Sequence, residues 1–164
     1  MSTAPKETIP TEPLKQETET QMITIRTASW FTALPAGHLK VGISRGVPRG
    51  TKAGYRRYRA LEPGPWFNSV TIPEYLERYN EILAALDPGK VADELVALGS
   101  GGVPVMLCYE QPASIERGET YCHRHIVSQW LEDRLGINVE EVDHPTLDRF
   151  AKLRQANIAP PSYA

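Results

Sequence analysis

The stretch between residues 88 and 136 constrains the fold most, because a helix pattern, a strand pattern and a second helix pattern follow one another there. PGKVADELVAL carries apolar residues at helical spacing, and VPVMLC is a short apolar run typical of a buried strand. A second helix is predicted from about Cys122 to Leu135, where Gly136 stops it. Strands that alternate with helices are typical of α/β layered folds with a largely parallel sheet, and we predict that fold class here.

The remainder of the chain continues this alternation. Thr71, with Glu74 three residues later, forms a capping-box pattern and predicts the start of an amphipathic helix that continues over 73–86. The connection over 47–70 is rich in Pro, Gly, Arg and Tyr, and a loop of that length inside a domain is usually functional or partly disordered. Three further strands and one further helix are expected over 22–27, 39–46, 137–142 and 144–155.

A single domain is expected within the 164 residues of the chain. We predict a disordered tail over 1–20, one α/β domain over 21–156 and a loose C-terminal tail over 157–164. No apolar run is long enough to span a membrane, and the N-terminus lacks the apolar segment of a signal peptide. The two cysteines suggest no disulfide framework, which favours a cytoplasmic, reducing location.

Acidic and basic residues are distributed unevenly along the chain. Residues 20–61 contain no acid and eight bases, and six of those bases lie within 45–59, together with Tyr55 and Tyr58. Such a cluster creates a local positive field although the net charge of the chain is −2. Two interpretations stay open: a solvated loop, or an anion-binding segment whose arginines pair with phosphate and whose tyrosines stack on bases.

Polar residues gather where the buried strand ends and where the following helix begins. Cys108 and Glu110 close the strand, and YCHRH at 121–125 opens the helix. Open α/β sheets bind their ligands at the carboxyl ends of the strands, and helix N-termini favour anions. We therefore predict a site there, with Ser44 and Arg45 beside it if the second strand is a neighbour of the first.

The helix N-terminus, Arg124 and a protonated histidine would all favour a thiolate at Cys122. The apolar periodicity of the helix predicts that Cys122 and His123 lie on its buried side, whereas Arg124 and His125 point toward the mouth and solvent. Glu110 beside His123 could orient the imidazole for proton transfer. Cys108, at the end of an apolar strand, is expected to be a small buried hydrophobe.

The leading hypothesis is an enzyme that acts on a phosphate-bearing substrate, a nucleotide or a nucleic acid, by phosphoester or glycosidic cleavage. The expected catalytic residues are Cys122, His123 and Glu110, with Cys122 as the nucleophile or the polar contact at the reacting centre. The expected substrate-binding residues are Arg124, Ser44, Arg45, Arg49, Tyr55 and Tyr58. The sequence indicates no cofactor, membrane contact or oligomeric state.

Two alternatives remain beside the enzyme. One is a non-catalytic nucleic-acid-binding module that uses the Arg/Tyr segment 45–59, with the CHR string as a structural helix start. The other is a zinc-stabilised adaptor with ligands drawn from Cys108, Glu110, Cys122 and His123. The eleven residues between Glu110 and Cys122 match no standard zinc spacing, so no metal is expected.

At these residues the chain resembles the domain-of-unknown-function family 488, whose members combine an early strand and loop with a later LCxE … CHR pattern. The matching pieces are ISRGVPRG (43–50), LCYE (107–110) and CHRHIVSQWL (122–131), and the resemblance covers roughly 22–142. The loop QPASIERGETY is longer than the family leads us to expect, and SRGVPRG replaces the Asp-Val-Arg-type string of many members. The resemblance implies a single Rossmann-like three-layer domain and supplies no activity. The pattern positions are Cys108, Glu110, Cys122, His123 and Arg124.

Overall fold

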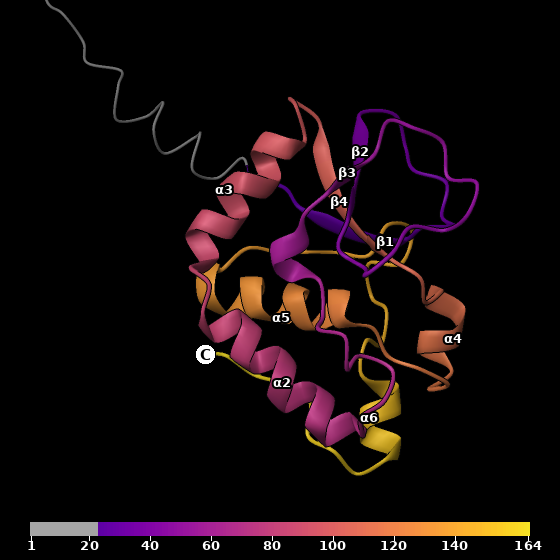
Figure 1. Cartoon of the computed structure of the whole chain (residues 1–164), viewed down its shortest axis with the longest axis vertical. Coiled ribbons are helices and arrows are strands. Elements are labelled where there is room, and N and C mark those ends of the chain that lie inside the picture. Colours follow the sequence, from indigo (N-terminus) through magenta and orange to yellow (C-terminus); the bar gives the residue numbers. More distant parts are fainter. Residues whose placement is uncertain (1–22) are drawn as a thin grey trace, which may run out of the picture.

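A four-stranded, all-parallel sheet forms the centre of the molecule, in the order β1-β4-β2-β3. The computed structural model describes residues 23–164, so the tail predicted over 1–20 lies outside the described residues. The strands are β1 (Arg26–Ser29), β2 (His38–Gly42), β3 (Arg56–Arg57) and β4 (Val103–Cys108). Helices flank the sheet (Figure 1), and the predicted α/β fold with a parallel sheet is confirmed.

The central strand β4 packs against a different apolar cluster on each face of the sheet. Val105 and Leu107 lie in a small cluster with Trp30. Met106 lies in the main core, which contains Val41 of β2 and residues from α2, α3 and α5. Because successive side chains of a strand point to opposite faces, this short apolar run supplies both cores, and its last residue reaches the helix-covered side.

Three helices of eleven to thirteen residues build that helix-covered side: α2 (Ile72–Ala84), α3 (Pro88–Leu98) and α5 (His123–Leu135). Thr71 caps α2 by accepting a hydrogen bond from the Glu74 N–H, as predicted. Helix α5 runs between the sheet and α2 (Figure 1), and it contacts α3, β4 and β1. Eight of its thirteen residues are buried, so α5 is the central helix of the fold.

Several segments differ from the sequence predictions. The strand expected over 137–142 is an extended segment that only bridges to β1, through two backbone hydrogen bonds with Thr27. Its pairing with β1 ends at Glu141, because the chain turns there and Glu141 also pairs with His144. The last helix, α6, spans only Ala151–Gln155. Additional short elements lie in the predicted loops: the 3-10 helix Arg59–Leu61 and α4 (Pro112–Glu116).

The last residues of the chain, 157–164, form no helix or strand, but they contact the domain through Tyr163. The Tyr163 N–H donates to Asp133 of α5, and its hydroxyl donates to Asn80 of α2. Within residues 23–164, every helix is too short or too polar to cross a membrane.

Candidate functional site

A cavity of about 640 Å³ opens where β2 and β4 end, at the carboxyl edge of the parallel sheet. We call it the main cavity. Its size is that of a small-molecule site, and its position is the one that open α/β sheets use for ligands. It is lined by Ser44, Arg45, Gly46, Pro63, Phe67, Asn68, Tyr75, Cys108, Tyr109, Glu110, Thr120, Tyr121, Cys122 and His123. The sequence-based expectation that Ser44 and Arg45 lie beside the Cys122 loop is confirmed.

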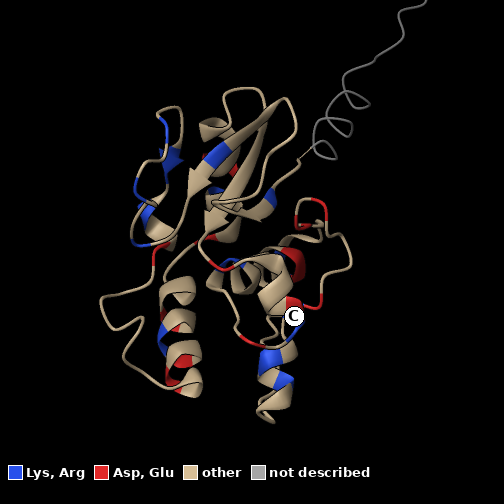
Figure 2. Cartoon of the chain, turned by 90° about the vertical axis from the view of Figure 1, so that its right-hand side faces the viewer, with Lys and Arg blue, Asp and Glu red and all other residues tan. Residues whose placement is uncertain are grey.

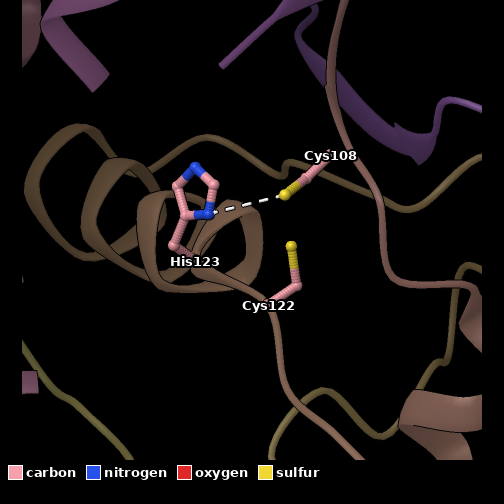
Figure 3. A group of neighbouring side chains, drawn as sticks. All are labelled: Cys108, Cys122 and His123. Atoms are coloured by element: carbon pink, nitrogen blue, oxygen red, sulfur yellow. Dashed lines mark hydrogen bonds between the residues drawn. The ribbon is translucent and has the colours of Figure 1, made fainter. Parts of the chain in front are cut away.

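Two thiols and an imidazole meet at the buried end of this cavity. Cys108 comes from the end of β4, whereas Cys122 and His123 come from the start of α5, and their Sγ and ring nitrogen atoms lie within 4.8 Å of one another. We call these three residues the cysteine–histidine cluster. The two sulfur atoms point toward each other, and the His123 ring lies beside Cys108 (Figure 3). Both cysteines are free. Cys108, expected to serve only packing, is therefore a member of the site.

The orientation of the His123 ring follows from its two contacts. Nε2 lies 2.8 Å from the carbonyl oxygen of Ile43, which can only accept, so Nε2 carries the proton. Nδ1 faces the Cys108 sulfur at 3.6 Å. The hypothesis that Glu110 orients the imidazole is wrong, because the Ile43 carbonyl holds Nε2 and the Glu110 carboxyl lies 3.4 Å from the Cys108 sulfur instead.

Cys122 is the N-cap residue of α5, and its sulfur accepts a hydrogen bond from the Arg124 N–H at 3.5 Å. Burial alone would raise the pKa of Cys122, but a hydrogen bond from the Cys108 thiol, the charge of Arg124 and the contact with His123 outweigh it and hold that pKa well below its usual range. The hydrogen bond to Cys122, together with burial, raises the pKa of Cys108. The surroundings of the pair therefore favour a thiolate on Cys122 and a thiol on Cys108.

Glu110 lies between this pair and the opening of the main cavity. Burial, followed by the negative charge of Cys122, raises the pKa of the Glu110 carboxyl to about 7. A carboxyl with such a pKa can both donate and accept a proton near neutral pH. Its Oε1 atom, 3.4 Å from the Cys108 sulfur, is within reach of the thiol proton.

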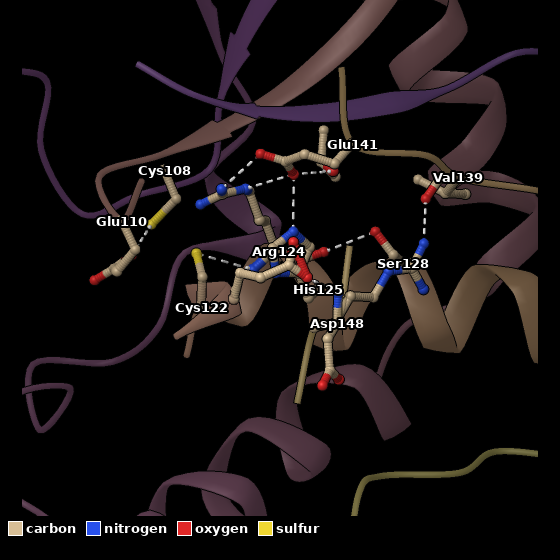
Figure 4. Close-up of polar contacts among 12 residues, drawn as sticks. Cys108, Glu110, Cys122, Arg124, His125, Ser128, Val139, Glu141 and Asp148 are labelled. Carbon is tan, nitrogen blue, oxygen red and sulfur yellow. Dashed lines mark hydrogen bonds and ion pairs between the residues drawn. The ribbon is translucent and has the colours of Figure 1, made fainter. Parts of the chain in front are cut away.

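A buried ion pair lies behind the cluster and sets its charge (Figure 4). Glu141 accepts hydrogen bonds from Arg124 Nε at 3.1 Å and Nη2 at 2.8 Å, from His125 Nε2 at 2.8 Å and from Thr27 Oγ1 at 2.7 Å. Burial alone would raise the pKa of Glu141, but the bonds from His125 and Arg124 hold it far below its usual value. Glu141 is therefore a carboxylate, and it fixes the Arg124 guanidinium near the two thiols.

The prediction that Arg124 and His125 face the mouth and solvent is wrong, since both side chains are fully buried. Residues 122–128 are all buried, so the first turns of α5 have no face in contact with solvent, whereas Arg134 near its end is exposed. Arg124 does not line the main cavity, and two of its nitrogens are bonded to Glu141. It acts on the site from behind the residues that line the cavity.

Sequence analysis missed the role of Glu141. The alternation in INVEEV offered a signal, because Glu141 shares a strand face with Ile137 and Val139 and should therefore point inward with them. A carboxylate on an inward face needs a buried cation, and Arg124 is that cation.

The aromatic mouth of the main cavity was missed as well. Phe67 and Tyr109 line it and remain 42% and 38% exposed, and Phe31 stacks at a tilt on Tyr109 with 6.5 Å between ring centroids. Exposed aromatic side chains at the entrance of a cavity offer flat surfaces on which a planar ligand can stack.

The basic segment 45–59 lies at one edge of the sheet, around β3, where the ribbon in Figure 2 carries many Lys and Arg positions. Arg45 reaches the main cavity, but Arg49 is exposed and does not line it. Both tyrosines of the segment make contacts within the chain. Tyr55 packs edge-on against Trp30, and the Tyr58 hydroxyl donates to Glu94 of α3. These contacts leave Arg45 as the charged residue of this segment that lines the cavity, next to Gly46.

Within residues 23–164, the cysteine–histidine cluster is the group of side chains that could hold a metal ion. Thiolate and imidazole suit zinc, and the cluster offers three donor atoms, one fewer than a closed structural zinc site uses. The comparisons with known proteins add nothing to this picture. The chain matches no protein-family model, no curated protein and no solved structure. Membership of the family that the sequence resembles stays a prediction.

Proposed function

We propose that the protein is a hydrolase that cleaves a small phosphate-bearing substrate, of nucleotide size, with Cys122 as its nucleophile. The observation that carries the proposal is the position of Cys122. Its sulfur lines a cavity of about 640 Å³ at a helix N-terminus, beside a buried arginine that favours its thiolate. A thiolate formed at neutral pH is an activated nucleophile without any further base.

The remaining groups of the site fit a two-step displacement. In the first step the Cys122 sulfur bonds to phosphorus, the bond to the leaving oxygen breaks, and the Glu110 carboxyl gives its proton to that oxygen. In the second step the Glu110 carboxylate takes a proton from water, whose oxygen displaces the sulfur and regenerates the thiolate. Glu110 can fill both roles because its pKa of about 7 lies near the pH of the reaction.

Features of the cavity mouth support the choice of substrate. Arg45 provides a guanidinium that can pair with phosphate oxygens. Phe67 and Tyr109 provide exposed rings on which a base can stack. A ligand that joins a planar group to an anion, such as a nucleotide, can contact both the guanidinium and the exposed rings. A long nucleic acid gains less, because Tyr55 and Tyr58 are engaged within the chain and Arg49 lies outside the cavity.

The test is a turnover assay with nucleoside monophosphates and an aryl phosphate, in which inorganic phosphate and free base are both measured. We expect phosphate release by the wild-type protein, its loss in Cys122→Ser, and a slower first step in Glu110→Gln. Arg45→Ala should raise KM more than it lowers kcat, whereas Arg49→Ala, the matched exposed control, should change neither. Release of free base instead of phosphate would indicate glycosidic cleavage, and no turnover of any member of the panel would reject the proposal.

A further inference from the structure

We propose that Cys108 and Cys122 form a dithiol site that a small hydroperoxide oxidises reversibly to a disulfide. The inference deepens the proposed function, since it uses the same Cys122 sulfur, and oxidation would remove the nucleophile. Its readout is a covalent bond within the protein, which needs no substrate turnover.

The geometry of the two sulfurs carries the inference. They point toward each other at the end of the main cavity (Figure 3) and lie within 4.8 Å of each other. Neither sulfur is part of a disulfide. A disulfide requires a sulfur–sulfur distance of about 2.05 Å. A local movement of Cys122 can bring the two sulfurs together. This residue has an extended conformation before the first turn of α5 and follows the segment 109–121, whereas Cys108 is held at the end of a central strand.

The protonation of the pair suits the two steps of the reaction. A hydroperoxide reacts with a thiolate, and the resulting sulfenic acid condenses with a nearby thiol. The Cys122 thiolate would attack the terminal oxygen of the hydroperoxide, the O–O bond would break, and the departing alkoxide would take the proton of Glu110. The products of this step are a sulfenic acid on Cys122 and an alcohol.

Cys108 then completes the oxidation. Glu110, now a carboxylate 3.4 Å from the Cys108 sulfur, takes the thiol proton. The Cys108 sulfur bonds to the Cys122 sulfur, and the S–O bond breaks. The departing hydroxide recovers the proton from Glu110 and leaves as water. The two sulfurs lose two electrons in total, which the O–O bond of the hydroperoxide accepts, and an external thiol reverses the reaction by disulfide exchange.

A buried cation without a full set of partners supports this chemistry. Arg124 Nη1 has no hydrogen-bond partner among the described residues, although the guanidinium is fully buried. In Figure 4, Arg124 extends from Glu141 toward the side on which Cys108 and Cys122 lie. Such a donor can bond to the oxygen that is transferred to sulfur, which would otherwise carry uncompensated charge in a buried place.

The same side chains distinguish a dithiol from a metal site. Arg124, whose charge is shared with the Glu141 carboxylate, and the N-terminus of α5 favour a single negative charge at the pair. A zinc ion would require both sulfurs as thiolates, and a nearby guanidinium with a free donor would repel the ion. The arrangement therefore favours one thiolate and one thiol over two metal ligands.

The experiment titrates the reduced full-length protein with hydrogen peroxide and with an alkyl hydroperoxide, and follows intact mass and peptide maps. We expect the mass to fall by two hydrogen atoms, one linked peptide containing Cys108 and Cys122, and full recovery with dithiothreitol. In Cys108→Ser, Cys122 should instead gain oxygen and react with a sulfenic-acid probe. Glu119→Gln changes an exposed carboxylate outside the main cavity, so this control variant should form the disulfide as the wild type does.

Three outcomes would overturn the inference. One is a wild-type protein whose cysteines stay reduced under excess hydroperoxide, and another is a disulfide between two chains instead of within one. The third is stoichiometric zinc in the purified protein that must be removed before either thiol reacts. Circular dichroism of each variant identifies a misfolded protein, and the wild-type result alone decides the main point. If the protein forms the disulfide but releases no phosphate, only the proposed hydrolase is rejected. If it releases phosphate but forms no disulfide, only the dithiol site is rejected.

Discussion

Replacing Glu141 with alanine should cost this protein a large part of its stability. The substitution removes the acceptor of four hydrogen bonds and leaves the fully buried Arg124 guanidinium without its paired carboxylate. Removing one partner of a buried ion pair costs about 3–5 kcal/mol. A domain of this size has a total stability of about 5–15 kcal/mol. With a urea slope of about 2 kcal/mol per M, the unfolding midpoint should fall by about 2 M.

Urea unfolding followed by circular dichroism measures this loss. Glu119→Ala is the control, because Glu119 forms an equally short pair with Arg117, at 2.7 Å, but on the surface, where water screens the charges. We expect no measurable change there. Glu141→Gln should fall between the two, since it keeps the shape and loses the charge. A loss in Glu141→Ala of less than about 1 kcal/mol would refute the view that Arg124 depends on Glu141 for its charge compensation.

Four further predictions concern pH, thiol reactivity and packing. Because hydrogen bonds hold the pKa of Glu141 low, its stabilising effect is present above the unfolded value near 4.5 and is lost as the pH falls, so Glu141→Gln should show a shallower acid decline in unfolding scans. Phosphate release should fall as the pH rises through about 7, where Glu110 loses its proton. Peptide-resolved alkylation should modify Cys122 at a lower pH than Cys108, because the pKa of Cys122 is lowered and that of Cys108 is raised. Gly42→Ala should lower the thermal midpoint, because the added Cβ would lie 2.5 Å from the Trp30 ring, an overpacking that costs about 1–3 kcal/mol.

Local patterns predicted the parts of the fold and the site that depend on neighbours in sequence. Thr71 and Asp87 cap the helices expected after them, and Cys122 stands at the start of α5 as its N-cap. The location of the site at the end of β4 followed from the same local assignment combined with a general rule for parallel sheets. The helix caps depend on hydrogen bonds between residues only two or three positions apart in the sequence.

The parts that could not be predicted depend on contacts between distant segments. The pairing of Arg124 with Glu141 joins α5 to a later extended segment, and the helical pattern alone placed Arg124 in solvent. The Tyr58 hydroxyl contacts Glu94, thirty-six residues away, so a tyrosine expected to stack on a ligand is engaged within the chain. Glu110 faces the Cys108 sulfur instead of the imidazole, whose Nε2 donates to the Ile43 carbonyl, eighty residues earlier in the chain. The alternation of INVEEV indicates that Glu141 points inward, but a single sequence does not identify the distant partner in such a pairing.

The position of β1 has a consequence for how the chain reaches its native state. Its partner β4 pairs Arg26 with Val105, and its other edge meets Glu141, whose carboxylate accepts from Thr27 across 114 positions of sequence. Sheets closed by such distant contacts have high contact order and fold slowly. Because Glu141 also anchors the guanidinium beside Cys122, the docking of its segment on β1 completes the charge around that sulfur. Before this contact forms, the Glu141 carboxylate does not hold the Arg124 guanidinium in place, so the low pKa of the Cys122 thiol is a property of the fully folded chain.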